Sequence, residues 1–379
     1  MSARSRRVLL SFVIAIIAMA LAPAAGLAAH HGKAHAAKDR RALPIVIGHR
    51  GAPAYRPEHT LASYRLAISM GADFIEPDVV STKDHQLVVR HENDITGTTD
   101  VAAHPEFADR ETTKVIDGVS HTGWFTEDFT LAELRTLHAV ERLPDIRPAN
   151  TAFNGLFQIP TLQEVIDLAK REHVGIYPET KHPTYFDSIG LSLEEPLVAA
   201  LKRNGLDRRN AKVFVQSFET GNLRQLDRMT KVPLIQLIDA TGAPFDLVSA
   251  GDPRTYADLV TPAGLKEIAT YADGIGPDKS RIVPLDATGH ITAPTSLIAD
   301  AHRAGLLVHP FTFRPENNFL AADFRLGNPA SPEFLRARGD EPAELALFYR
   351  LGVDGLFADN ADTAVAVREK TFRTDDGDD

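Results

Sequence analysis

The sequence contains no cysteine among its 379 residues. Disulfide bonds, thiolate metal sites, a cysteine nucleophile and a lipid on an N-terminal cysteine are therefore excluded. Basic residues are outnumbered, with 41 Lys and Arg against 51 Asp and Glu, and the net charge is −10. A chain this acidic is a poor partner for nucleic acid, whose phosphate backbone requires basic surface. Aromatic residues make up only 7%, but apolar residues reach 44%, which is enough for a sizeable core.

Long apolar runs are also missing, except for one near the N-terminus. Three arginines precede the apolar run 8–21, and small residues follow it. This order is typical of a signal peptide, which we assign to residues 1–29, with a polar tether over 30–42. The run is shorter than the roughly 20 residues of a membrane span. We therefore expect an exported protein, periplasmic or secreted, without stable membrane insertion after cleavage; an uncleaved anchor is the alternative. The stretch SRRVLL resembles a twin-arginine signal.

Strand-like apolar runs alternate with helical patterns from Leu43 onward. This alternation is typical of a βα fold with a parallel sheet. The expected strands are residues 45–50, 74–80, 87–92, 174–181, 213–218, 233–238, 273–279, 306–313 and 353–360. The clearest expected helices are residues 60–71, 161–172, 193–205 and 294–305.

The second and third of these strands are separated only by the polar segment STKDHQ. A parallel crossover needs about a dozen residues or more, so this pair must form an antiparallel hairpin. The other eight strands can then close as a (β/α)8 TIM barrel. With a turn centred on residues 83–84, Glu76 is expected opposite His91, and Asp78 opposite Val89.

Residues 95–158 fit no βα unit. We expect them to form an insertion after the hairpin that follows strand 2, lying over the barrel mouth, with Trp124 packed and a short helix over 130–137. The barrel domain is expected to span residues 43–370. A disordered acidic tail is expected over 371–379.

The carboxyl ends of the strands carry the residues that indicate chemistry, because active sites of such barrels lie there. The expected strands end in His49 and Arg50, Glu76 and Asp78, Glu179 and Lys181, Gln216, and Asp359, and the hairpin returns His91. Clustered carboxylates repel one another and need a cation, and oxygen ligands select Ca²⁺ or Mg²⁺. Arg and Lys beside a hard cation suit a phosphate ester, and two histidines suit proton transfer near neutral pH. Together they indicate metal-assisted cleavage of a phosphodiester.

Each of these positions has a structural alternative. Glu76 and Asp78 could form salt bridges at a strand end, and Lys181 could simply pair with Glu179. We expect the remaining nearby histidines to be structural, namely His59, His85, His104, His121 and His182.

The same residues carry a family resemblance. The stretch GHRGAPAYRPEHTLASYRLAISMGADFIEPDVVSTKDHQLVVRHENDITGTTDV closely resembles the opening of the glycerophosphodiester phosphodiesterases, particularly the exported bacterial type. The family pattern is His-Arg, then Glu-x-Asp, then a second His after LVV, and all three occur here in order. PETK and LFADNAD match later family strands. The resemblance covers residues 44–368, and several motifs in order are a specific signal.

The resemblance implies a (β/α)8 barrel that hydrolyses glycerophosphodiesters to an alcohol and sn-glycerol 3-phosphate. It implies these roles: His49 and His91 as acid–base pair, Glu76, Asp78 and Glu179 as ligands of one divalent cation, and Arg50 and Lys181 as phosphate-binding residues. Gln216 completes the expected substrate-binding set. We place Ca²⁺ ahead of Mg²⁺, and we assign His49 as base and His91 as acid. The nucleophile is either water or the neighbouring glycerol hydroxyl.

One departure from the family pattern is Glu92, which follows His91 where Asp is common. We expect tuned rather than lost activity. Three alternatives stay open: a phosphodiesterase for glycerophosphate polymers such as teichoic acids or for phospholipids, an enzyme like the phospholipases D of spider venom, and a non-catalytic glycerophosphodiester-binding protein. The headgroup and the oligomeric state are left open.

Overall fold

The computed structural model describes residues 43–373, and everything below concerns that part of the chain. The predicted signal peptide (1–29), the tether (30–42) and residues 374–379 lie outside the described residues, so export stays a prediction. No helix among residues 43–373 combines the length and apolar character needed to cross a bilayer.

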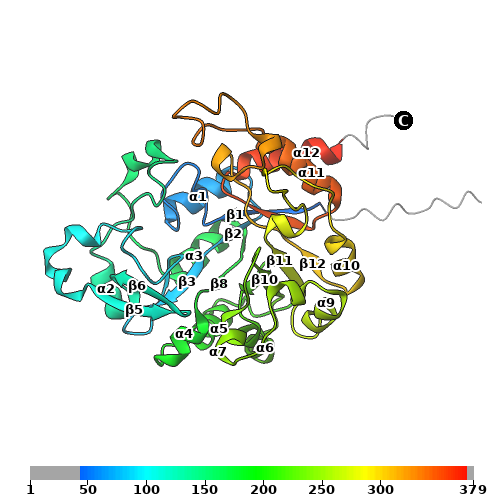
Figure 1. Cartoon of the computed structure of the whole chain (residues 1–379). Helices are drawn as coiled ribbons and strands as arrows, with labels where there is room; N and C mark the ends of the chain where they lie inside the picture. The colour runs from blue at the N-terminus through cyan, green and yellow to red at the C-terminus, as the bar shows by residue number, and fades with distance from the viewer. Residues whose placement is uncertain (1–42, 374–379) are drawn as a thin grey trace, which may run out of the picture. The chain divides into compact units, whose positions relative to one another are not determined.

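Strands and helices alternate along the chain as the sequence predicts (Figure 1). The strands are β1 (Ile45–His49), β2 (Phe74–Glu76), β3 (Asp78–Ser81), β4 (Leu87–Val89), β5 (Thr112–Ile116), β6 (Val119–Gly123), β7 (Gly175–Ile176), β8 (Glu179–Thr180), β9 (Val215–Ser217), β10 (Leu234–Ile238), β11 (Gly274–Pro277), β12 (Leu307–Val308) and β13 (Gly355–Ala358). The helices are α1 (Leu61–Ser69), α2 (Leu131–Leu134), α3 (Leu162–Glu172), α4 (Pro183–Ser188), α5 (Glu194–Arg203), α6 (Thr220–Met229), α7 (Phe245–Ser249), α8 (Tyr256–Leu259), α9 (Pro262–Ile268), α10 (Leu297–Arg303), α11 (Glu341–Leu351) and α12 (Ala361–Arg373).

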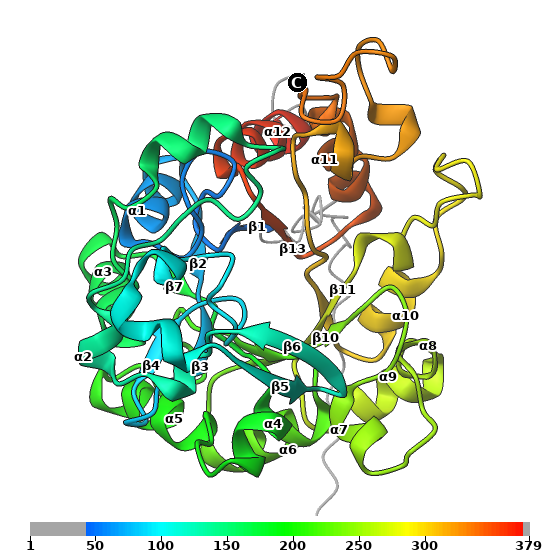
Figure 2. The same ribbon diagram turned by 60° about the vertical axis from the view of Figure 1, so that its left-hand side comes forward.

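The parallel strands form a ring with helices outside it (Figure 2). Two sheets, ordered β13-β1-β2-β7 and β12-β11-β10-β9-β8-β3-β4, supply its wall. Pro77 separates β2 from β3, and Pro178 lies between β7 and β8, because proline cannot donate to a ladder. Single parallel bridges, Ile176 with Val213 and Phe313 with Ala358, join the sheets at both ends. The predicted (β/α)8 barrel is confirmed.

The hairpin β3–β4 is antiparallel as predicted, but its predicted register is wrong by one residue. Val79 lies opposite Val89, and the Arg90 N–H donates to the Asp78 carbonyl, 3.1 Å away. Asp78 therefore does not face Val89, and Glu76 is not the partner of His91. The turn contains three residues rather than two, with His85 in the left-handed conformation (φ 56°), and the extra residue shifts the pairing.

The first strand-to-helix turn places His49 and Arg50 at the end of β1. Arg50 and Gly51 both have positive φ, 54° and 95°. A Cβ on Gly51 would lie 2.5 Å from the Ser63 Oγ, so only glycine fits against α1. Thr60 then caps α1 by accepting from the Ser63 N–H. This turn therefore leads from β1 into α1, which packs closely against it on the outside of the barrel.

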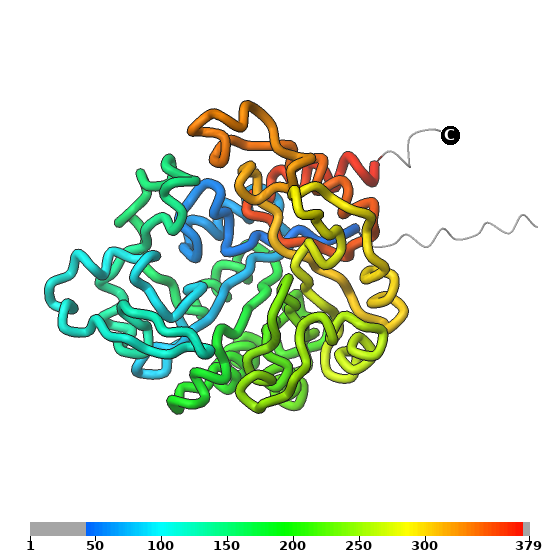
Figure 3. The backbone as a smooth tube through the Cα atoms, viewed as in Figure 1, coloured from blue at the N-terminus to red at the C-terminus, as the bar shows by residue number. Residues whose placement is uncertain are grey.

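Residues 95–158 fold into ordered structure between the hairpin and α3 (Figure 3, cyan to green). Strands β5 and β6 form a second hairpin whose turn is Asp117-Gly118, both with positive φ. Trp124 is 8% exposed and donates its indole N–H to the Phe107 carbonyl. The predicted helix over 130–137 is shorter, because α2 covers only Leu131–Leu134.

The barrel domain ends later in the chain than predicted, because α12 continues to Arg373. Residues 371–373 are helical, although the sequence analysis assigned them to a disordered tail. The Phe372 ring packs edge-on against Tyr349, with 6.1 Å between the ring centroids. Apolar contact with α11 therefore carries the helix past the predicted end of the barrel domain.

His309, just after β12, gives the barrel interior a pH-dependent stability. Its side chain is buried, its Nδ1 contacts the Tyr177 hydroxyl at 2.8 Å, and burial lowers its pKa to about 4. The unfolded chain takes up this proton below about pH 6.5, whereas the folded protein resists it until about pH 4. The contribution of His309 is thus present above pH 6.5 and is lost as the pH falls toward 4.

We expect His309→Asn to remove this part of the pH dependence. Between pH 7.5 and 4.5, urea unfolding of the wild type should lose about 2–3 kcal/mol more stability than the variant. His290→Asn is the matched control, because the His290 side chain is 53% exposed. Equal losses in the wild type and in His309→Asn would contradict the expectation.

Candidate functional site

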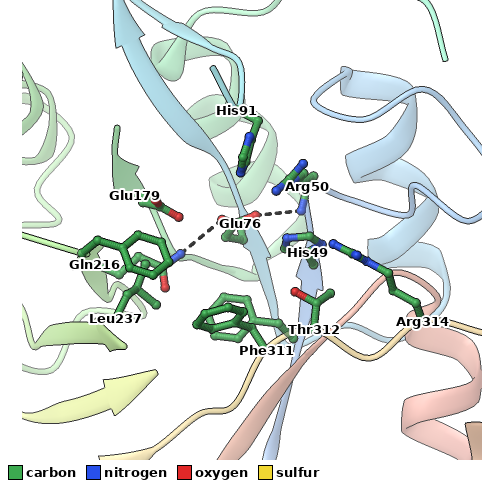
Figure 4. Close-up of a pocket in the computed structure, with 12 residues that line it drawn as sticks. His49, Arg50, Glu76, His91, Glu179, Gln216, Leu237, Phe311, Thr312 and Arg314 are labelled. Atoms are coloured by element: carbon green, nitrogen blue, oxygen red, sulfur yellow. Dashed lines mark hydrogen bonds between the residues drawn. The ribbon is translucent and has the colours of Figure 1, made fainter. Parts of the chain in front are cut away.

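The carboxyl ends of the strands surround a cavity of about 120 Å³ (Figure 4). The predicted site residues that line it are His49, Arg50, Glu76, His91, Glu179 and Gln216. Asp78 and Lys181 contact residues of this lining. One carboxylate oxygen of Asp78 lies within 4.8 Å of an oxygen of Glu76 and of Glu179, and the Lys181 Nζ lies 2.8 Å from Glu179. The structure therefore brings all eight predicted residues together.

Each of the two predicted histidines is held by a carboxylate at Nδ1. The His49 Nδ1 lies 2.6 Å from Asp359, at the end of β13, and the His91 Nδ1 lies 2.6 Å from Glu92. Burial and the nearby Arg50 lower the pKa of His49 to about 4 and that of His91 to about 3. Both rings are thus neutral at neutral pH in the free protein, and Nε2 is the ring nitrogen that contacts no carboxylate.

Three carboxylates, Glu76, Asp78 and Glu179, form the acidic centre of the site. One oxygen of each lies within 4.8 Å of the others, and all three residues are at most 5% exposed. The Asp78 Oδ1 is buried without a hydrogen-bond partner. Burial and mutual repulsion raise the pKa of Glu76 well above its usual value and that of Glu179 to about 8. Clustered oxygens with an orphaned acceptor fit a hard divalent cation.

Neighbouring groups fix how these carboxylates point. The Arg50 backbone N–H donates to the Glu76 Oε2 at 2.7 Å, and the Gln216 amide donates to Oε1 at 3.1 Å (Figure 4). The His59 Nε2 contacts Asp78 at 2.9 Å and is fully buried. His59, predicted to be structural, therefore orients a candidate metal ligand. Such outer partners commonly fix the geometry of metal ligands.

The two predicted phosphate-binding cations are already paired in the free protein. The Arg50 guanidinium lies 3.1 Å from Glu58, and Lys181 lies 2.8 Å from Glu179 and 3.4 Å from the His91 Nε2. The salt bridge that the sequence analysis offered as the alternative role for Lys181 is thus present. Pairing does not remove Lys181 from the site, because its ammonium contacts both a candidate metal ligand and His91.

A hydrogen-bonded chain continues outward from His91. Glu92 contacts His91 with one oxygen and the His182 Nε2 with the other, 2.7 Å away. The His182 Nδ1 then lies 2.6 Å from Asp117, in the turn of the β5–β6 hairpin. Burial disfavours charge on His182, but Asp117 and Glu92 raise its pKa to about 9. The glutamate that departs from the family pattern therefore bridges two histidines.

Two arginines that the sequence analysis did not identify hold Asp359. Arg147, from the segment 95–158, donates to Asp359 at 2.5 Å and to Glu316 at 2.7 Å, and the Arg314 Nε lies 3.3 Å from Asp359. Arg314 directly follows the expected strand 306–313, and this position at a strand end was the available signal. Nothing in the sequence pattern points to Arg147.

A (β/α)8 barrel that gathers two histidine–carboxylate pairs, a carboxylate cluster and two cations at its strand ends has the construction of a hydrolytic enzyme. A family model described as the glycerophosphoryl diester phosphodiesterase family matches residues 49–363. The chain belongs to this family, as the sequence resemblance predicted.

Known proteins of the family align with most of the chain. A glycerophosphodiester phosphodiesterase of Arabidopsis thaliana is 37% identical over 341 residues, covering 86% of each protein. One from Haemophilus influenzae is 29% identical over 348 residues, covering 85% of this chain and 88% of the relative. The solved structure of an Oleispira antarctica phosphodiesterase in complex with the product sn-glycerol-3-phosphate has a TM-score of 0.55 at 20% identity, covering 86% of this chain and 96% of that one. That similarity supports the fold.

Proposed function

We propose that this enzyme hydrolyses glycerophosphodiesters to an alcohol and sn-glycerol 3-phosphate, with one divalent cation, Ca²⁺ ahead of Mg²⁺, and two histidines as acid and base. The observation that carries the proposal is that one cavity is lined both by His49 and His91 and by members of the carboxylate cluster. Family membership and the names of the relatives support the substrate class.

Glu76, Asp78 and Glu179 would hold the cation, which supplies charge neutralisation at the phosphoryl oxygens when bound. Arg50 lines the same cavity and would add hydrogen bonds to those oxygens. Lys181 would exchange part of its contact with Glu179 for the phosphate. These groups bind the phosphate and stabilise the charge that grows on it as the diester is cleaved.

His49 is assigned as the general base. Its Nδ1–H donates to Asp359, so a neutral ring presents the basic Nε2 to the nucleophile. The carboxylate then stabilises the imidazolium that forms, as in other histidine–carboxylate pairs. Two nucleophiles fit this role: water, or the glycerol hydroxyl next to the phosphate, which would give a cyclic phosphate before hydrolysis.

His91 is assigned as the general acid for the leaving alcohol. Burial, with Arg50 and Lys181 nearby, lowers its pKa in the free enzyme, whereas Glu92 raises it. A bound phosphate diester offsets the two cations, which favours the protonated ring that a general acid requires. The contact between Glu92 and the His91 Nδ1 orients the ring throughout.

Product analysis by ³¹P NMR tests the substrate class. Glycerophosphocholine and glycerophosphoethanolamine should both release sn-glycerol 3-phosphate, and a transient cyclic phosphate would identify the glycerol hydroxyl as the nucleophile. A glycerophosphate polymer, assayed in parallel, should be cleaved more slowly. Cleavage of the polymer alone would overturn the proposed small-molecule substrate.

The chain from Asp117 to His91 predicts a leaving-group-dependent defect in Asp117→Asn. If Asp117 and His182 position Glu92, and Glu92 positions the acid, the variant should lower kcat for glycerophosphocholine about tenfold. An activated p-nitrophenyl glycerophosphodiester needs little protonation of its leaving group, and its kcat should change less than about twofold.

The control for this experiment is Asp109→Asn, an exposed carboxylate of the same segment. It should behave as wild type on both substrates. Equal losses of Asp117→Asn on both substrates would indicate a structural role for Asp117, and no loss on either would show that the chain does not act on His91.

A further inference from the structure

A second cavity, of about 380 Å³, opens beside the first. Glu179 and Phe218 line both cavities, so the second adjoins the proposed phosphate site. It lies between the ends of β8, β9 and β10 and the helices α7 and α8. Its volume is about three times that of the first cavity, and the proposed mechanism places no part of the substrate in it.

The charges that line this cavity do not balance. Its two cations are already paired, Lys181 with Glu179 and His182 with Asp117. Two further carboxylates, Glu219 and Asp239, form no salt bridge with any described residue. Glu219 is only 3% exposed, and its oxygens accept from the Thr184 N–H and hydroxyl instead. A buried carboxylate without a cation is costly, and a positively charged ligand would relieve that cost.

Aromatic side chains supply the second feature of a cation site. Tyr256 is 6% exposed and lines the cavity, yet its hydroxyl has no hydrogen-bond partner among the described residues. Phe218 packs edge-on against Tyr256, with 6.2 Å between the ring centroids. Burial raises the pKa of Tyr256, and the nearby Asp239 and Glu219 raise it further. Aromatic faces beside carboxylates bind alkylammonium groups.

The geometry of the proposed acid points the leaving group toward this cavity. The His91 Nε2 lies 3.4 Å from Lys181, and Lys181 lines the second cavity. An alcohol that takes its proton from His91 therefore leaves on the side of Lys181. We place the phosphate and its glycerol arm in the smaller first cavity, which His49 and Arg50 line.

We propose that the second cavity is a subsite for a positively charged leaving alcohol, with Glu219, Asp239 and Tyr256 as its specificity-determining residues. This inference rests on the proposed function. It goes further by naming a class of substrate, the glycerophosphodiesters of alkylammonium alcohols, over neutral ones of the same shape.

Two substrates test this selectivity without changing shape. Glycerophosphocholine is compared with its neutral isostere, the glycerophosphodiester of 3,3-dimethylbutanol, in which carbon replaces the ammonium nitrogen. At pH 8.5, above the pKa of about 8 to which burial raises Glu219, the wild type should favour the choline substrate about tenfold in kcat/KM. Asp239→Asn and Glu219→Gln should each reduce that ratio severalfold.

The exposed Asp239 keeps the test valid if Glu219→Gln fails to fold. Glu172→Gln, at an exposed position of α3, is the matched control and should keep the wild-type ratio. Hydrolysis of both substrates with equal kcat/KM, or a ratio that survives both substitutions, would overturn the subsite. Failure of the wild type to cleave either substrate would instead overturn the proposed function.

Discussion

Alanine in place of His49 or His91 is expected to lower kcat for release of sn-glycerol 3-phosphate by about 10²–10⁴-fold, the usual contribution of a positioned acid or base. Each ring lines the cavity and is held at Nδ1 by a carboxylate, so neither neighbouring water nor another side chain reproduces its position. The double variant should lose little more than the worse single variant, because the two groups act in one reaction.

Stopped assays of glycerophosphocholine with purified variants measure this effect. His290→Ala is the control, because its side chain is about half exposed and contacts Asp323 rather than the site. The p-nitrophenyl substrate separates the two roles: His91→Ala should retain much of its activity on it, and His49→Ala should not. Near-wild-type turnover of both single variants would contradict acid–base catalysis by this pair.

Glu76→Gln is expected to abolish binding of the cation and to lower turnover by about 10³-fold, since several kcal/mol of charge stabilisation disappear with the cation. Thermal unfolding reads out binding without reference to activity. At a Ca²⁺ concentration of about 100 Kd, the wild type should gain about 2.7 kcal/mol of stability, and its Tm should rise. Without added cation, the variant should be at least as stable as wild type, because burial and the neighbouring carboxylates already disfavour charge on Glu76 and the neutral Gln never has to carry it.

Glu58→Gln separates this effect from a general loss of negative charge at the mouth of the barrel. Glu58 is buried and pairs with Arg50, but it is not among the three clustered carboxylates. Its variant should keep the rise in Tm with Ca²⁺. A wild type whose Tm does not change with either Ca²⁺ or Mg²⁺ would contradict the assignment of the carboxylates as ligands. A Glu76→Gln variant whose Tm rises with Ca²⁺ as in the wild type would contradict it as well.

The sequence was sufficient to predict the barrel and the positions of its main side chains, for a simple physical reason. Buried parallel strands are apolar along their whole length, so polar residues such as His49 and Glu76 mark the strand ends. In a barrel, all those ends meet on one face. The eight residues selected on this basis lie together in the structure.

The pattern of polar residues at strand ends could not predict the register of the hairpin or the contacts of residues 95–158. The hairpin register depends on one left-handed residue, His85, which nothing in the local pattern singles out. The Asp117-Gly118 dipeptide between two β-rich runs was a usable hairpin signal, and it would have predicted β5 and β6. Its contact with His182, and that of Arg147 with Asp359, join residues far apart in the sequence. Only tertiary structure supplies such pairs.

The most direct measurement is release of sn-glycerol 3-phosphate from glycerophosphocholine by the mature enzyme, before and after EDTA, and again after addition of Ca²⁺ or Mg²⁺. We predict that EDTA abolishes release and that one of the two cations, Ca²⁺ ahead of Mg²⁺, restores it. Release that EDTA does not affect would contradict a catalytic cation at Glu76, Asp78 and Glu179. Absence of release under all conditions would contradict the proposed substrate.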